Sequence, residues 1–297
     1  MVIIDPATRP SGHPESRHPQ SWRARLRHAR FPGALPGLGT RQLAWWYAAF
    51  AVYASGVALF SGPGLDHWWG TWAAGGYAVT AIVAACWPGR RARRAALTTA
   101  MTGALAAPLT WLATREPSTP DVTVVVRSAS LLVRHGSPYL PSAQLLHGGW
   151  LSCDPYLPAM AVFGLPHALG LPGLAGDPRP WLAAASFAVL ALAFRLASPG
   201  SAPGKAAGGP PSLGSALGLA AFATSSPVLA FPLAMGITDP PVIALTCLAL
   251  ALLTRSALAR AALVVGVACA MKYTAWPAVV VFAAMLAARD GLRTALR

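Results

Sequence analysis

The sequence predicts an all-α fold: a polytopic integral membrane protein with about eight or nine transmembrane helices. Hydrophobic residues make up 55% of the 297 positions and charged residues only 11%, whereas soluble domains carry about 25% charged residues. The mean hydropathy is +0.50, and low-charge apolar runs recur along most of the chain. The soluble globular class is therefore excluded.

The charge is strongly positive and gathers beside the apolar runs. The chain carries 23 Lys and Arg against 9 Asp and Glu, a net charge of +14. Arginines cluster before the first run and after the second, at Arg9, Arg17, Arg23, Arg25, Arg27, Arg30, Arg41, Arg90, Arg91, Arg93 and Arg94. Basic clusters that flank spans mark the cytoplasmic side. We therefore expect a multi-pass plasma-membrane protein with a cytoplasmic N-terminus and no nucleic-acid partner.

Residues 1–41 are rich in Arg, His and Pro, which predicts a disordered basic cytoplasmic tail before a transmembrane domain over 42–297. The tail is too long and too polar for the n-region of a cleavable signal. The cysteines show no metal-ligand spacing: Cys86, Cys153, Cys247 and Cys269. Neither a zinc site nor a disulfide framework is expected, and no metal or cofactor is predicted.

The first half of the transmembrane domain is interpreted as three spans, at 42–60, 71–87 and 95–113. The turn 61–69, which holds Asp66 among tryptophans, is then external, and so is the long loop 114–156. Further apolar runs follow at 157–172, 180–197, 213–233, 240–254, 258–271 and 273–288.

The later runs raise a problem of parity. If each crossed once, Arg255 and the C-terminal arginines would lie outside, against the positive-inside preference. The run 157–172 carries three prolines, so we expect a broken or re-entrant element there that does not cross. The Gly/Pro/Ser-rich stretch 198–212 predicts a flexible linker.

Residues 121–134 in the outer loop predict a short amphipathic helix. Its apolar face holds Val122, Val125, Val126, Ala129, Leu132 and Val133, and its polar face holds Thr123, Arg127, Ser130 and Arg134. Such a helix is about 21 Å long, too short to span, so it should lie in the headgroup plane. Pro120 and Asp121 begin it and Gly136 ends it, although the run of valines is also typical of a strand.

Three acids of the outer loops are candidates for chemistry. Asp121 is either the N-cap of the amphipathic helix or a general base held at the membrane surface. Asp66 and Asp154 are the alternatives, and for Asp66 a turn in an aromatic belt is the preferred interpretation. His135 and His147 lack metal-ligand spacing, and no phosphate-loop or hydrolase motif occurs in the chain.

Two charged residues interrupt apolar stretches further on. Asp239 is either a carboxylate that faces an internal cavity or a first-turn acid before Pro240. Lys272 has aromatic neighbours and is either an interfacial lysine that snorkels or a cation for a lipid-linked phosphate. The residues alone leave both choices open.

These segments, in this order, resemble one family. They read Asp121, Leu132-Val-Arg-His-Gly-Ser-Pro-Tyr139, Pro155-Tyr-Leu-Pro158, Gly236-Ile-Thr-Asp239 and Lys272-Tyr-Thr-Ala-Trp-Pro277. The pattern is similar to glycosyltransferase family 87, formerly a domain of unknown function, which is the polyprenol-phosphate-mannose-dependent mannosyltransferase-like group of the GT-C superfamily of membrane glycosyltransferases. The resemblance covers about residues 120–290.

The resemblance implies a GT-C-like fold and a transferase that moves a hexose, with mannose the first expectation. The donor would be a polyprenyl-phosphate sugar and the acceptor an extracytoplasmic glycan or glycolipid. A single inverting displacement is implied, in which an aspartate takes the acceptor proton while cations hold the lipid phosphate. The implied base is Asp121, with Asp66 and Asp154 as alternatives. The implied substrate contacts are Arg127, Arg134, Tyr139, Tyr156, Asp239 and Lys272.

The chain also departs from the family pattern. Val124-Val-Val stands where an aromatic-rich stretch is usual, two apolar runs precede the usual first span, and an end at Arg297 suggests missing C-terminal spans. The Arg/Ala/Pro/Gly-rich composition is typical of a high-GC actinobacterium. A transporter of small or lipid-linked solutes, with Asp239 and Lys272 as intramembrane charges, is the alternative function. A catalytically inactive GT-C relative is a third.

Overall fold

The computed structural model describes residues 39–115, 119–147, 149, 152–197 and 213–290. Within these residues every regular element is a helix, which confirms the predicted all-α class. Most of the predicted tail and all of the linker 198–212 lie outside the described residues.

The first elements are α2 (Thr40–Phe60), α3 (Leu65–Cys86), α4 (Arg90–Ala100), the π-helical η1 (Met101–Ala106), α5 (Ala107–Arg115), α6 (Pro120–His135) and α7 (Ser142–His147). The 3-10 helix η3 (Pro158–Gly164), α8 (Leu165–Ala168), α9 (Gly173–Gly176) and α10 (Pro178–Ala197) follow. The last are α11 (Leu213–Thr224), α12 (Pro227–Met235), α13 (Asp239–Thr254), α14 (Leu258–Met271), the 3-10 turn η5 (Tyr273–Ala275) and α15 (Trp276–Asp290).

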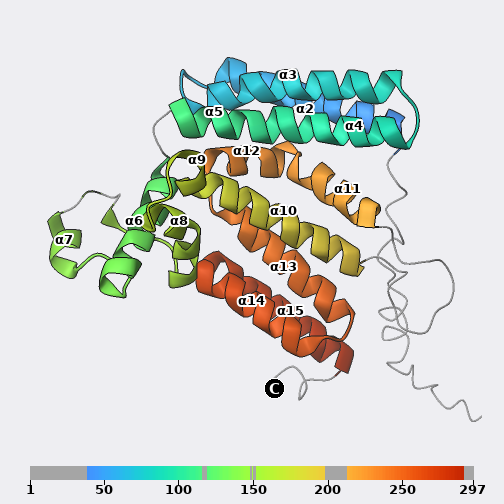
Figure 1. The fold of residues 1–297 in the computed structure, drawn as a ribbon. Coiled ribbons are helices and arrows are strands. Elements are labelled where there is room, and N and C mark those ends of the chain that lie inside the picture. The colour runs from blue at the N-terminus through green and yellow to red at the C-terminus, as the bar shows by residue number, and fades with distance from the viewer. Residues whose placement is uncertain (1–38, 116–118, 148, 150–151, 198–212, 291–297) are drawn as a thin grey trace, which may run out of the picture.

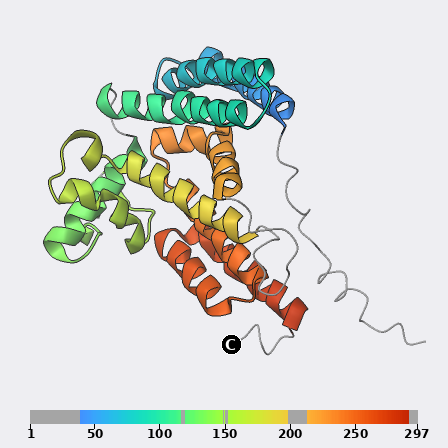
Figure 2. The ribbon, with the colours of Figure 1, turned by 45° about the vertical axis from the view of Figure 1, so that its right-hand side comes forward.

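The helices stack in layers, as Figures 1 and 2 show. One layer holds α2, α3 and the continuous helix α4–η1–α5. Beneath it lie α11, α12, α10 and α13, and α14 and α15 form the opposite side. Helices α6 to α9 cover one end of the stack, which we call the loop end. The other end, where α4 begins at Arg90, is called the arginine end.

Three helices of the described chain are long and apolar enough to cross a membrane: Thr40–Phe60, Arg90–Arg115 and Pro178–Ala197. The pair Ala216–Thr224 and Pro227–Met235, bent by 67°, counts as a fourth if it is one span. Asp239–Thr254, Leu258–Met271 and Tyr273–Ala287 are shorter apolar helices. The apolar runs of the sequence therefore become helices, several of them shorter than a straight span requires.

The expected external turn 61–69 is wrong in its extent, because α3 begins at Leu65 and takes up Asp66. An acid in the first turn is favoured by the helix dipole, and His67 Nδ1 lies 2.7 Å from the Ala58 carbonyl oxygen of α2. The run 157–172 is broken, as its prolines predict: it forms η3 and the one-turn α8.

Two buried tyrosines tie the first layer to the break between α11 and α12. The Tyr47 hydroxyl lies 2.9 Å from Ser225 Oγ, and the Tyr77 hydroxyl donates to the Ser225 carbonyl at 2.5 Å. Pro227 has no N–H to continue the helix, so the chain bends there. The tyrosines satisfy polar groups that the bend exposes inside an apolar core.

Gly236 ends α12 at a crowded point near the loop end. Its φ of 81° lies in the left-handed region. A Cβ added there would come 2.4 Å from Val122 Cγ2 of α6 and 3.0 Å from Arg179 Cγ of α10. Only glycine therefore satisfies both the backbone and the packing of three helices at this position.

Gly236→Ala is expected to cost about 2–5 kcal/mol, from left-handed strain and overpacking. Gly136→Ala is the matched control, because Gly136 has φ 72° but open space around its Cβ, and should cost about 1–2 kcal/mol. Thermal unfolding in detergent measures both. Equal losses of Tm would contradict the packing role assigned to Gly236.

Candidate functional site

Four segments far apart in the sequence meet at the loop end. They are the first turn of α6, the segment before η3, the start of α13 and the junction of α14 with η5. They supply the residues of one polar cluster, here called the acid–tyrosine–lysine cluster: Asp121, Asp154, Tyr156, Asp239 and Lys272. The backbone N–H of Leu157 donates to the Met271 carbonyl at 3.0 Å, which holds two of these segments together.

Tyr156 is the centre of the cluster. Its side chain is buried, and its hydroxyl donates a hydrogen bond to Asp121 Oδ1. Burial raises the pKa of Tyr156, and the hydrogen bond to Asp121 raises it further. The phenol therefore stays protonated at neutral pH and remains a donor. Asp121 Oδ2 accepts no hydrogen bond from the described residues, and the residue is partly exposed.

Asp154 has a different environment, because both of its carboxylate oxygens are engaged. Oδ1 accepts from the Tyr156 backbone N–H at 2.9 Å, and Oδ2 accepts from the Ser128 hydroxyl of α6. The Tyr139 hydroxyl donates to the Tyr156 carbonyl at 3.2 Å. Burial and the charge of Asp154 raise the pKa of Tyr139. Asp154 and Tyr139 thus hold Tyr156 in place from both sides.

Lys272 brings a cation to the same cluster. Its Nζ lies 2.6 Å from Asp239 Oδ1 and 3.5 Å from Thr238 Oγ1. The same nitrogen lies 5.5 Å from the centre of the Tyr156 ring, within the range of a cation–π contact. A positive charge therefore stands on one side of Tyr156, while the carboxylate of Asp121 is bound to its hydroxyl.

Of the two interpretations of Asp121, the one that makes it the N-cap of α6 is wrong. Thr119 is the N-cap: its Oγ1 accepts from the Val122 N–H at 3.4 Å and donates to the Met235 carbonyl at 2.9 Å. Asp121 is the second helical residue, after Pro120. Threonine caps well and proline suits the first helical position, so the Asp121 carboxylate is left to bond Tyr156. Gly136 ends the helix with φ 72°, as predicted.

Besides Tyr139, which bonds the Tyr156 carbonyl, three sequence candidates lie outside the cluster. Arg127 Nη2 donates to the Ser152 carbonyl at 3.4 Å and so holds the loop before Asp154. Arg134 is exposed in the last turn of α6, about 20 Å along the helix from Asp121. Asp66 is exposed in the first turn of α3, in another layer.

The structure adds a buried arginine that the sequence reasoning missed. Arg179 is 1% exposed, and its Nε lies 3.9 Å from Asp177 Oδ1. Its aliphatic stem packs beside Gly236, next to Val122. The signal was present, because Asp177-Pro-Arg-Pro opens an apolar run with two charges, and charges at such positions are costly unless they have a role.

Fold and site together define a class: an all-helical protein with several apolar helices and a hydrogen-bonded acid–tyrosine–lysine cluster at one end. In the described ranges, no group of His, Cys, Asp and Glu is placed to hold a metal ion. No family model, curated protein or solved structure matches the chain.

Proposed function

We propose that this chain is a membrane glycosyltransferase of GT-C type, which moves a hexose from a polyprenyl-phosphate donor to an extracytoplasmic glycan or lipid acceptor. The observation that carries the proposal is the cluster itself. A carboxylate with one oxygen available and a lysine on the other side of a buried tyrosine suit an inverting transfer from a phosphate leaving group. Mannose is the first sugar to test, on the family resemblance of the sequence.

The distribution of charge supports a membrane orientation. The passages between the two ends are α2, α3, α4–α5, α10, α11–α12, α13, α14 and α15. If these eight passages are spans, the start of α2, Arg90–Arg94 and Arg255 all lie at the arginine end. There Arg255 Nε donates to the Leu196 carbonyl. Because 157–172 does not cross, the arginine end matches the positive-inside preference. The loop end then faces outward.

In the proposed reaction, a hydroxyl oxygen of the acceptor attacks the anomeric carbon of the donor sugar. The bond from that carbon to the phosphate oxygen breaks, and the phosphate leaves with the electron pair. Asp121 Oδ2 takes the hydroxyl proton, while Tyr156 holds Oδ1. Lys272 stabilises the negative charge of the leaving polyprenyl phosphate, with Asp239 orienting its ammonium group.

Membranes that contain this protein are expected to incorporate radiolabelled mannose from polyprenyl-phosphate-mannose above the level of membranes without it. Glucose and galactose donors in parallel identify the hexose. If the protein is present in the membrane fraction and incorporation from every donor stays at the level of membranes without it, the transferase proposal is contradicted and an inactive relative is favoured.

The second candidate, a transporter, has two observations in its favour. The 67° break between α11 and α12 and the Asp239–Lys272 pair are features that transporters place near their substrate sites. Uptake of a labelled sugar into vesicles, without its transfer to an acceptor, would favour this function. Transfer without net uptake would favour the glycosyltransferase.

A further inference from the structure

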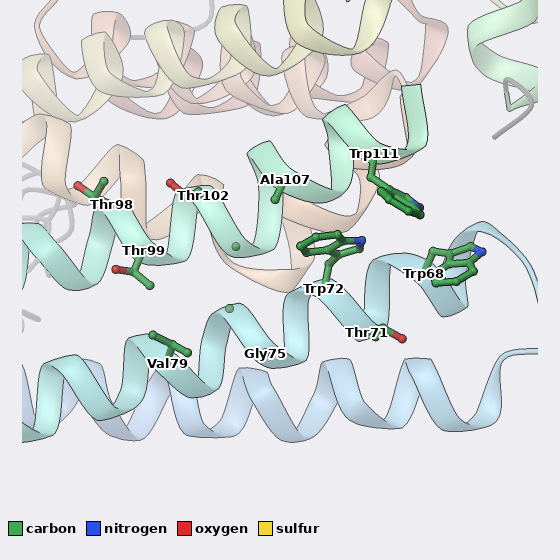
Figure 3. Close-up of a pocket in the computed structure, with 12 residues that line it drawn as sticks. Trp68, Thr71, Trp72, Gly75, Val79, Thr98, Thr99, Thr102, Ala107 and Trp111 are labelled. Atoms are coloured by element: carbon green, nitrogen blue, oxygen red, sulfur yellow. The ribbon is translucent and has the colours of Figure 1, made fainter. Parts of the chain in front are cut away.

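A groove runs between α3 and the helix α4–η1–α5, away from the acid–tyrosine–lysine cluster (Figure 3). Its volume is about 740 Å³, and none of its lining residues belongs to the cluster. It extends from Thr98 to Trp111 on one wall, which is about 20 Å of helix. The groove therefore covers roughly two thirds of a 30 Å hydrocarbon core.

The two walls of the groove come into backbone contact at a pair of glycines. A Cβ on Gly76 would come 2.6 Å from Gly103 Cα, so the backbones touch at this glycine pair. Gly75 lies one residue away, exposed, with nothing within 4 Å of an added Cβ. At these glycines the groove is free of side chains, so a flexible hydrocarbon chain can lie against the backbone there.

The end of the groove nearest the loop end is aromatic and cationic. Trp68 and Trp72 of α3 each lie 5.9 Å from the Trp111 ring of α5, and Figure 3 shows all three gathered at that end. The Arg115 guanidinium stands 4.9 Å from the Trp111 ring. Trp111 Nε1 is buried and makes no hydrogen bond within the described residues. The Arg115 guanidinium lines the hollow that adjoins this end of the groove and complements an anionic headgroup, while the buried Trp111 N–H is out of reach of that headgroup.

We infer that this groove binds one anionic phospholipid of the outer leaflet, with an acyl chain along Gly75 and the headgroup at Arg115 and Trp111. The inference rests on the membrane orientation proposed above but not on sugar transfer. Tryptophans at headgroup level and an arginine beside the phosphate follow the general pattern of interfacial lipid contacts. The lipid would cover two walls that the chain itself leaves open.

Native mass spectrometry of the detergent-purified full chain tests the inference, with phosphatidylglycerol and the zwitterionic phosphatidylcholine as probes. We expect phosphatidylglycerol to bind more tightly by about fivefold, the contribution of one arginine near an anionic headgroup. Arg115→Gln should reduce that preference to near unity. Gly75→Leu should fill the groove and remove the tightest adduct of either lipid. Gly266→Leu is the control, because Gly266 is also an exposed helical glycine with open space around it.

Equal binding of the two lipids to the unmodified chain would overturn the inference. So would equal effects of Gly75→Leu and Gly266→Leu. If Gly75→Leu instead changes the oligomeric mass and leaves the lipid adducts intact, the groove holds a second copy of the chain and the inference fails. Because none of these readouts needs activity, their failure is distinct from failure of the mannose assay.

Discussion

Asp121→Asn is expected to lower sugar transfer by about 10²-fold or more, with normal insertion and near-normal Tm. Asparagine keeps the shape of the side chain but cannot take a proton, and general-base catalysis contributes about 10²–10⁴-fold. Because Thr119 caps α6, the substitution leaves the helix start intact. Turnover of labelled donor by purified protein, with Tm measured on the same samples, checks both parts.

Two other aspartates serve as controls for Asp121. Asp66 is exposed in the first turn of α3 and lies outside the acid–tyrosine–lysine cluster. Asp66→Asn should leave transfer within about twofold of the unmodified chain, because surface substitutions remote from a site or core have small effects. Asp154→Asn should lower Tm and activity together, since Asp154 holds Tyr156 and Ser128. An active Asp121→Asn with a dead Asp66→Asn or Asp154→Asn would show that the base is misassigned even if the reaction is correct.

Lys272→Met is expected to lower kcat by about 10²-fold, comparable to the loss of one donor that stabilises charge in a transition state. Methionine retains the length and apolar stem of the side chain and removes the charge that faces the leaving phosphate. The loss should be larger for kcat than for KM, because the phosphate charge grows as the bond breaks. Initial rates over a range of donor concentrations measure the two separately.

The double variant Lys272→Met with Asp239→Asn separates catalysis from charge balance. Lys272→Met alone leaves the Asp239 carboxylate without its partner, although that carboxylate is 46% exposed and water solvates part of its charge. The double variant removes both charges, so Tm should recover while transfer stays low. Arg134→Gln, remote from the cluster, should be near normal. Recovery of transfer in the double variant would limit Lys272 to a structural ion pair.

Local features of the chain were readable from the sequence because their causes are local. The apolar runs became helices, Gly136 ended α6 in the left-handed region, and the prolines of 157–172 broke that segment. Each follows from hydropathy, from the missing Cβ of glycine or from the missing N–H of proline. The N-cap was misread because two residues separated only by Pro120, Thr119 and Asp121, both suit a cap.

The sequence by itself therefore determined the helical class, the order of the apolar runs and which polar residues interrupt them. It did not determine how those polar residues pair. The link from Asp121 to Tyr156 spans 35 positions and the link from Asp239 to Lys272 spans 33, and no periodicity connects residues so far apart. Only the packing of α13 and α14 beside α6 and η3 brings them together. The partly buried members of the cluster are stabilised by these polar contacts, and the tertiary structure decides which residues make them.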